Sequence, residues 1–186
     1  MTDFAPATTP LLQQWSAELR TRSGLRLYVR PVTSDDDDLV DRFYASLSLD
    51  DLRFRFLSPV ARASSSLLEA LVAVDHVRTE DFLAFTEVSG EMELIASAML
   101  AADPSLNRAE VAIAVHPEYK NKGVCWTLLD FVSRDAQARG IKTLESVECR
   151  DNSAAIDLEK EMGFIARPYP GDASLTLLSK RLIDRN

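Results

Sequence analysis

The chain of 186 residues lacks the features that mark several large classes of protein. Cys125 and Cys149 are its only cysteines, and their spacing suits neither a metal centre nor, in a reducing compartment, a disulfide. No apolar run approaches the ~20 residues of a membrane span. The first ten residues also lack the basic and apolar regions of a signal peptide. We therefore expect a cytoplasmic protein with no metal and no membrane partner.

Positive charge is scarce as well. The 21 basic residues face 29 acidic ones, which gives a net charge of −8 at pH 7. Because a phosphate backbone would be repelled, nucleic acid is disfavoured as a general partner, whereas a cationic partner is compatible with the charge. The hydrophobic share of 46% and the length are those of one globular domain with a substantial core.

The patterns of apolar residues predict an α/β domain at 21–186, preceded by an N-terminal tail at 1–20. Strands are expected at 25–30, 82–88, 94–100, 110–116, 142–149 and 173–178. Helices are expected at 34–48, from about 49, and at 64–72, 124–138 and 153–162. A hairpin turn at Ser89-Gly90 followed by strand–helix–strand predicts a mixed sheet with helices on its faces.

The loop between the strand at 110–116 and the helix at 124–138 is the most informative stretch. It carries Lys120, Lys122 and Gly123 immediately before the helix. A helix N-terminus has unpaired N–H groups and partial positive charge, so this loop predicts a site for a polyanion such as a pyrophosphate.

Alternation along the same strand separates two faces. One face carries bulky apolar residues, namely Val111, Ile113 and Val115, and the other carries Glu110, Ala112, Ala114 and His116. The two alanines leave a trough for a narrow ligand, with Glu110 at one end. A strand packed against a close helix, with Glu110 reaching solvent, fits the pattern equally well.

Two stretches resemble the signatures of the GCN5-related N-acetyltransferase (GNAT) superfamily. Residues 115–125 are similar to its acetyl-CoA signature, in which Arg or Gln, two residues, Gly, one residue, then Gly or Ala form the pyrophosphate loop. Residues 152–164 are similar to its second signature, an Asn, an Ala, a Leu, then Gly-Phe. The resemblance covers about residues 25–180, and the first half also resembles the acetyltransferase domain of bacterial protein-lysine acetyltransferases.

The resemblance implies a single-domain GNAT fold, a mixed central sheet flanked by helices, that transfers an acetyl group from acetyl-CoA to a primary amine. That amine would belong to a protein lysine, a polyamine or a small metabolite. Backbone groups of Ile113, Ala114 and Val115 would bind the pantetheine amides, and Asn152 would contact the CoA arm near the thioester. The pyrophosphate would be held by backbone N–H groups of Lys120, Asn121, Lys122, Gly123, Val124 and Cys125. The oligomeric state stays open, a homodimer included.

The sequence departs from the family pattern at two positions. Cys125 stands at the last small position of the loop, and Glu159 stands where many members carry a Tyr that acts as general acid. With that Tyr absent, Glu110 is the expected general base for the amine, assisted by at most one of Glu145 and Glu148, which point to opposite faces. The alternative to an enzyme is a non-catalytic acyl-CoA sensor or interaction module. A nucleotide-binding protein unrelated to CoA would need more glycines in the loop than Gly123.

Overall fold

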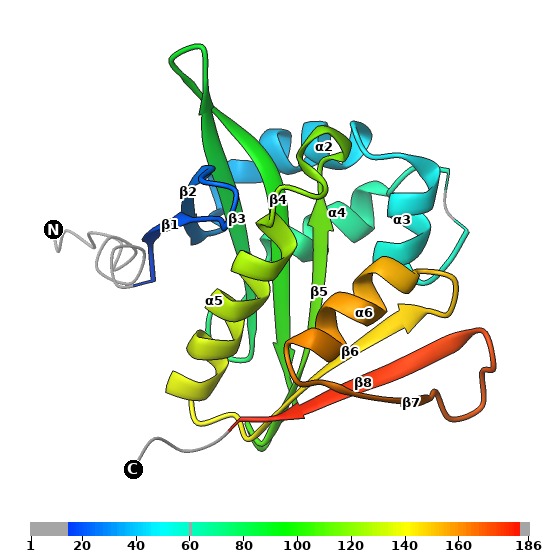
Figure 1. Cartoon of the computed structure of the whole chain (residues 1–186). Helices are drawn as coiled ribbons and strands as arrows, with labels where there is room; N and C mark the ends of the chain where they lie inside the picture. Colours follow the sequence, from blue (N-terminus) through cyan, green and yellow to red (C-terminus); the bar gives the residue numbers. More distant parts are fainter. Residues whose placement is uncertain (1–14, 60, 183–186) are drawn as a thin grey trace, which may run out of the picture.

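An eight-stranded mixed sheet forms the centre of the molecule, in the order β1-β2-β3-β4-β5-β6-β8-β7 (Figure 1). The computed structural model describes residues 15–59 and 61–182. The strands are β1 (Ala17–Arg20), β2 (Arg26–Pro31), β3 (Thr79–Val88), β4 (Glu91–Ala102), β5 (Arg108–Val115), β6 (Thr143–Cys149), β7 (Ile165–Pro168) and β8 (Leu175–Arg181). The helices are α2 (Asp37–Ala45), α3 (Leu49–Phe56), α4 (Ser65–Val72), α5 (Val124–Ala138) and α6 (Ser153–Glu161), with 3-10 turns η1 (Ser34–Asp36) and η2 (Pro117–Tyr119). The predicted fold class is confirmed.

Most elements lie where the sequence predicts them. Helix α5 has the predicted bounds, and β3 and β4 meet at the predicted turn, where Ser89 and Gly90 both have positive φ. The helix predicted from residue 34 starts as the turn η1 and ends at Ala45 instead of residue 48.

Two short edge strands are absent from the prediction. Strand β1 pairs with β2 from Ala17↔Val29 to Arg20↔Arg26, so the assignment of residues 17–20 to a tail is wrong. Strand β7 pairs with β8 and ends at Pro168. Four residues show too little alternation to mark a strand, and their pairing is decided by the neighbouring strand. Residues 1–14 of the predicted tail lie outside the described part of the chain.

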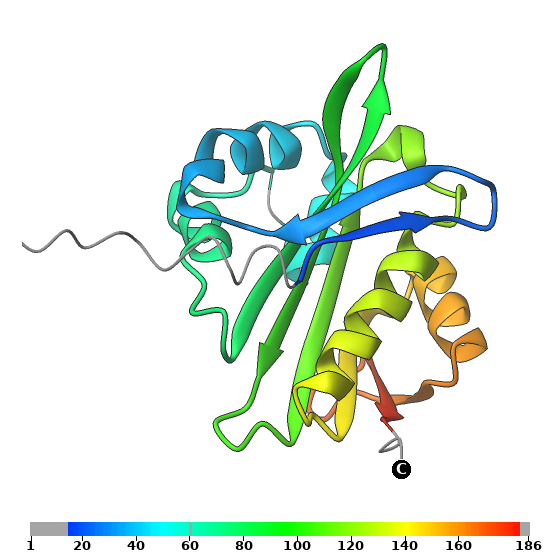
Figure 2. The same cartoon turned by 90° about the vertical axis from the view of Figure 1, so that its left-hand side faces the viewer.

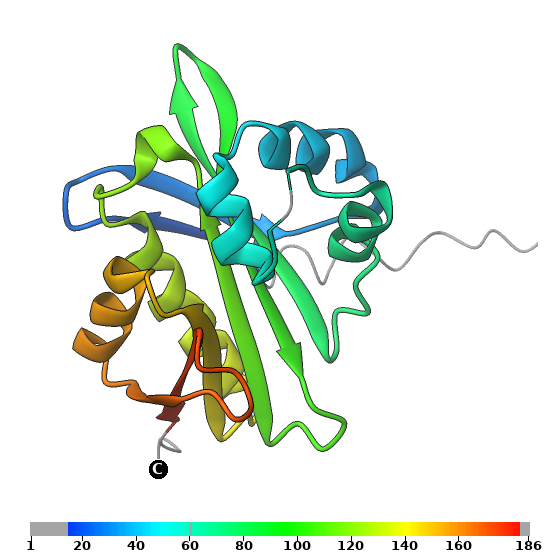
Figure 3. The same cartoon turned by 90° about the vertical axis from the view of Figure 1, so that its right-hand side faces the viewer.

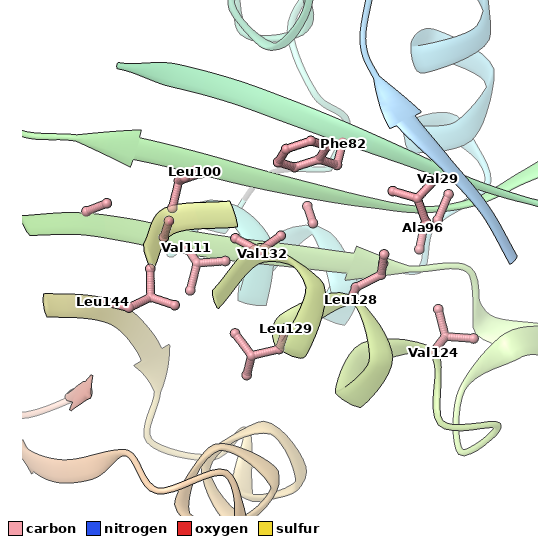
Figure 4. Packing of buried hydrophobic residues seen from close by; sticks show 14 of the residues in the cluster. Val29, Phe82, Ala96, Leu100, Val111, Val124, Leu128, Leu129, Val132 and Leu144 are labelled. Carbon is pink, nitrogen blue, oxygen red and sulfur yellow. The ribbon is translucent and has the colours of Figure 1, made fainter. Parts of the chain in front are cut away.

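Two hydrophobic cores lie on opposite faces of the sheet. On one face α5 inserts Val124, Leu128 and Val132, all at most 1% exposed, against strands β2 to β6 (Figure 4). Each such side chain contributes about 1.5–3 kcal/mol through its burial. On the other face α2, α3 and α4 pack with Leu83, Phe85 and other side chains of the sheet. Figure 2 shows the sheet between the two layers of helices.

Strands β5 and β6 run parallel but pair over only three positions, from Arg108↔Thr143 to Glu110↔Glu145. Beyond Glu110 the two strands diverge (Figure 1). Strand β5 stays paired with β4 on its other side as far as Val115↔Ala96. The edge of β5 that faces β6 is therefore available to a ligand along residues 111–115.

A buried polar group lies between β3 and β4. The carboxylate of Asp81 is fully buried and accepts a hydrogen bond of 2.8 Å from the hydroxyl of Ser97, which is also within 3.2 Å of the Tyr44 hydroxyl. Burial raises the pKa of Asp81 from 3.8 to about 7, although the charge of Arg55 opposes this. Between pH 3.8 and about 7, the folded protein therefore keeps a proton on Asp81 that the unfolded chain has released.

We predict that Asp81→Asn changes the pH dependence of stability. Because the pKa is raised on folding, the stability of the parent relative to the variant falls as pH rises from 3.8 towards about 7. The change is on the order of a few kcal/mol, and urea unfolding at a series of pH values measures it. The control is Asp103→Asn, since hydrogen bonds from Ser105 and backbone groups lower the pKa of Asp103 and predict the opposite sign. Parallel pH profiles for the parent and Asp81→Asn would contradict the prediction.

Candidate active site

Two adjoining cavities lie between the diverging strands. The larger, of about 440 Å³, follows the end of β5 and the loop before α5 and reaches the start of α6. The smaller, of about 90 Å³, lies deeper between β5 and β6. The residues that line both are Phe54, Ile113, Cys125, Asn152 and Ala155. The two cavities therefore adjoin, and together their lining extends from the loop to Glu110.

The residues that the sequence assigns to CoA line the larger cavity, with one exception. Those on its wall are Ile113, Ala114, Val115, Lys120, Asn121, Gly123, Val124, Cys125 and Asn152. Lys122 is the exception. Its ammonium group lies 4.7 Å from the centre of the Tyr119 ring, and its carbonyl oxygen accepts a hydrogen bond of 2.7 Å from Ser23.

The loop has the backbone conformation of a ligand-binding turn. Asn121 and Gly123 both have positive φ, of +60° and +79°, and Gly123 is the N-cap of α5. A Cβ on Gly123 would lie 3.4 Å from the Cβ of Thr21 and 3.6 Å from the backbone nitrogen of Arg22. The first N–H groups of α5 have no partner inside the helix, and the residues that carry them line the larger cavity. This arrangement suits a phosphate group.

Asp51 and Phe54 of helix α3 line the larger cavity, and Figure 3 shows this helix in front of the central strands. Asp51 of this helix accepts a hydrogen bond from the ammonium group of Lys120 in the loop. Arg53, on the same helix, donates to Asp151 before α6 at 2.8 Å. The two ion pairs join α3 to the loop and to the residues before α6. No local pattern in the sequence indicates either of them.

Glu110 lines the smaller cavity, together with residues of β6 and α6. Its carboxyl group remains accessible to water, yet the surrounding protein raises its pKa by desolvation. The charge of Arg55 on α3 opposes the rise, and that of Glu145 adds to it. A carboxylate with a raised pKa is a stronger base than an ordinary Glu, which is the property that an amine deprotonation requires.

Two further carboxyl groups line this cavity. Glu148 of β6 accepts a hydrogen bond of 2.7 Å from the side-chain amide of Asn152, and the Ser146 hydroxyl donates to Glu159 of α6. Burial raises the pKa of both carboxyl groups, and the charge of Glu159 raises that of Glu148 further. Glu145, by contrast, forms an ion pair of 3.0 Å with Arg108.

Cys125, in the first turn of α5, lines both cavities. Burial raises the pKa of its thiol to about 12, and the charges of Glu159 and Glu148 act in the same direction. The helix N-terminus favours a thiolate, but desolvation and the two carboxyl groups outweigh it. Cys125 therefore carries a neutral thiol at physiological pH.

Residues 42–164 match the Acetyltransferase (GNAT) family. The chain belongs to this family. It is an N-acetyltransferase, and members of the family use acetyl-CoA. The family predicted from the two signatures is thereby confirmed.

The relatives of this GNAT protein agree with the assignment. An acetyltransferase from Pseudomonas aeruginosa is 26% identical over 151 residues, which is 81% of each chain. The GNAT domain of PAT from S. lividans has a TM-score of 0.81 at 24% identity, over 96% of this chain and 99% of that one. Spermidine N-acetyltransferase from Vibrio cholerae, solved with CoA and spermine, has a TM-score of 0.66 at 17% identity, over 83% and 95%. These two structural likenesses concern the fold.

The described residues contain neither a metal centre nor a membrane-spanning helix. Among them, no cluster of three or more His, Cys, Asp or Glu side chains is placed to hold a metal ion. No helix in the described ranges has the length and apolar character to cross a membrane. Both cysteines are free thiols.

We predict that Cys125→Ala keeps turnover within about threefold of the parent, because a neutral thiol contributes no nucleophile. Removing the sulfur also gives more room beside the loop, so acetyl-CoA should bind as well or better. Steady-state kinetics and calorimetry measure the two effects, with the other free cysteine, Cys149→Ala, as the control. A large loss of kcat with retained acetyl-CoA affinity would show instead that the thiol has a chemical role.

Proposed function

We propose that this protein transfers the acetyl group of acetyl-CoA to a primary amine, with Glu110 as the general base. The observation that carries the proposal is a pair of adjoining cavities with three features. The glycine-containing loop and the N-terminus of α5 lie at one end, the open edge of β5 runs along them, and Glu110 lies at the other end. An elongated ligand with a pyrophosphate and a reactive end fits this arrangement.

The loop and the strand edge would share the binding of the cofactor. Backbone N–H groups of residues 120–125 would hold the pyrophosphate, with added positive charge from Lys120 and Lys122. The open edge at Ile113, Ala114 and Val115 would bind the pantetheine amides in the way that an added strand binds. Asn152, on the opposite wall, would contact the CoA arm near the thioester.

Glu110 would accept a proton from the substrate ammonium, directly or through a water molecule. The neutral amine then attacks the thioester carbon, and backbone N–H groups stabilise the charge that develops on the oxygen. A C–N bond forms as the C–S bond breaks. The raised pKa of Glu110 supports the first step, since it brings the base closer to the operating pH.

The charge around the site favours a cationic acceptor. Glu110, Glu148 and Glu159 line the smaller cavity, and the whole chain carries −8, so the field attracts an ammonium group. A protein lysine, a polyamine and an amine metabolite share that chemistry. We place the reaction in the cytoplasm, where free thiols stay reduced.

A CoA-release assay with polyamines, amine metabolites, lysine peptides and intact proteins tests the proposal. Turnover with any of these amines supports acetyl transfer. Acetyl-CoA binding without turnover on the whole panel would point instead to a non-catalytic acyl-CoA sensor.

We expect Gly123→Val to abolish acetyl-CoA binding, because a side chain at φ +79° strains the loop and contacts Thr21. Circular dichroism should show a folded variant, and calorimetry measures the affinity. The matched control is Gly140→Val at the other end of α5, where φ is +84° and a Cβ has no neighbour within 4 Å. It imposes a similar backbone strain away from the cavity and should keep parental affinity. Unchanged affinity in Gly123→Val would rule out this loop as the pyrophosphate site.

Glu110→Gln keeps the shape of the side chain and removes the proton acceptor. We expect kcat to fall by about 10²- to 10⁴-fold, as for the loss of a general base. Acetyl-CoA affinity should barely change, because backbone groups hold the cofactor. The acidic limb of the pH–rate profile, where protonation of Glu110 inactivates the parent, should disappear.

The control for this variant is Glu145→Gln, in register with Glu110 on β6. The charge of Glu145 raises the pKa of Glu110, so its removal should move the acidic limb to lower pH without abolishing it. If Glu110→Gln turns over at the parental rate with the parental profile, the base is another group.

A further inference from the structure

Arg55 of α3 lines the smaller cavity together with Glu110, but it forms no ion pair with any carboxylate among the residues that the structure describes. Its Nε atom is buried and has no hydrogen-bond partner. Its Nη2 atom contacts the sulfur of Met99 at 3.5 Å, which is a weak acceptor. Because a buried donor without a partner costs stability, this guanidinium indicates a ligand that the folded chain does not supply.

The side chains around Arg55 hold it in place without neutralising its charge. Arg55 shares a hydrogen bond with the Tyr44 hydroxyl, which lies 3.2 Å from the hydroxyl of Ser97. Ser97 in turn donates to the buried carboxyl group of Asp81 at 2.8 Å. Burial raises the pKa of Asp81 to about 7 against the charge of Arg55. The guanidinium is therefore fixed by neutral groups and keeps an unmatched positive charge at the cavity.

The anion that matches this charge belongs to the acceptor rather than to CoA. The larger cavity contains the loop for the pyrophosphate, and Arg55 is not among its lining residues. The smaller cavity, of about 90 Å³, also contains three glutamates, namely Glu110, Glu148 and Glu159. These carboxyl groups disfavour a phosphate with two negative charges. A carboxylate has one charge, and its two oxygens fit the fork of a guanidinium.

We propose that Arg55 binds a carboxylate of the acceptor, so that the substrate is a small molecule with both an amine and a carboxylate. The inference rests on the proposed acetyl transfer with Glu110 as the base. Glu110 and Arg55 line one cavity whose volume is far below the ~300–1,000 Å³ of sites for larger ligands. Only a few bonds would therefore separate the amine at Glu110 from the carboxylate at Arg55.

The same residue would select against the other classes of amine. A polyamine brings a second ammonium group into a cavity that already contains the charge of Arg55, and the two positive charges repel each other. The side chain of a protein lysine has no carboxylate near its amine, so it would leave the Nε atom of Arg55 without a partner. An amino acid supplies one group of each sign and leaves neither charge unmatched.

The test compares amino acids with their carboxamides, which keep the amine and the shape but lose the negative charge. Glycine is paired with glycinamide and β-alanine with β-alaninamide, and longer homologues extend the series. The parent should have a higher kcat/KM for the acid in at least one pair. In Arg55→Met the ratio of acid to amide should fall by about 10- to 100-fold, mainly through KM. Differences in the reactivity of the amines cancel, because one ratio is compared between two proteins.

The matched control is Arg62→Met, which removes the same charge from a side chain that is 72% exposed. Its ratio of acid to amide should equal that of the parent. Arg55→Met has a second effect, since the charge of Arg55 opposes the raised pKa of Glu110. The acidic limb of the pH–rate profile should move to higher pH for the acid and the amide alike, and this shift leaves their ratio at the pH optimum unaffected.

An unchanged ratio in Arg55→Met, with both members of each pair slowed equally, would show that Arg55 acts only on Glu110 or on the fold, and would overturn the proposal. If Arg55→Met does not fold, the parent decides. A parent that acetylates carboxamides or polyamines as well as it acetylates amino acids would overturn the carboxylate site and leave acetyl transfer standing. A parent that acetylates no amine would overturn the transfer reaction itself, and this inference with it.

Discussion

The divergence of β5 and β6 beyond the register pair Glu110↔Glu145 is the constraint on which the site depends. Parallel strands that stayed paired would satisfy each other's backbone groups and leave no room for a ligand. Strand β5 holds its place because it remains paired with β4 as far as Val115. Helix α5 follows β5 in the chain and helix α6 follows β6, so the two helices separate where the two strands separate. The opening thus combines a strand edge and a helix N-terminus without loss of core packing.

The divergence also determines the electrostatics of the site. It brings Glu110 from β5 into the same cavity as Glu148 and Glu159, and it leaves the carboxyl groups in different environments. Glu110 is accessible to water and feels the charge of Arg55. Glu159 is buried and faces a second carboxyl group. Groups of one chemical type therefore differ in how far the surrounding protein shifts their pKa.

Much of the fold follows from local patterns in the sequence. The apolar stripe of α5 and its stop signal at Gly140 predicted the helix with its observed bounds. The alternation in β5 predicted two faces, and Val111 and Ala114 do pack into different cores. The two short edge strands escaped prediction because β1 and β7 depend on a neighbouring strand rather than on a pattern of their own.

For the site, the sequence by itself determined the loop with Gly123, the strand edge before it and Glu110 as a candidate base. Each of these features depends on only a few consecutive residues. It is a glycine that permits a positive φ, an alternation of side chains along a strand, or the start of a helix. Only the tertiary structure decided that Glu148 and Glu159 meet, that Arg55 lies in the same cavity as Glu110 and that α3 is joined to the loop through Asp51 and Lys120. The reason is that burial and the distances between charges depend on elements that are far apart in the chain.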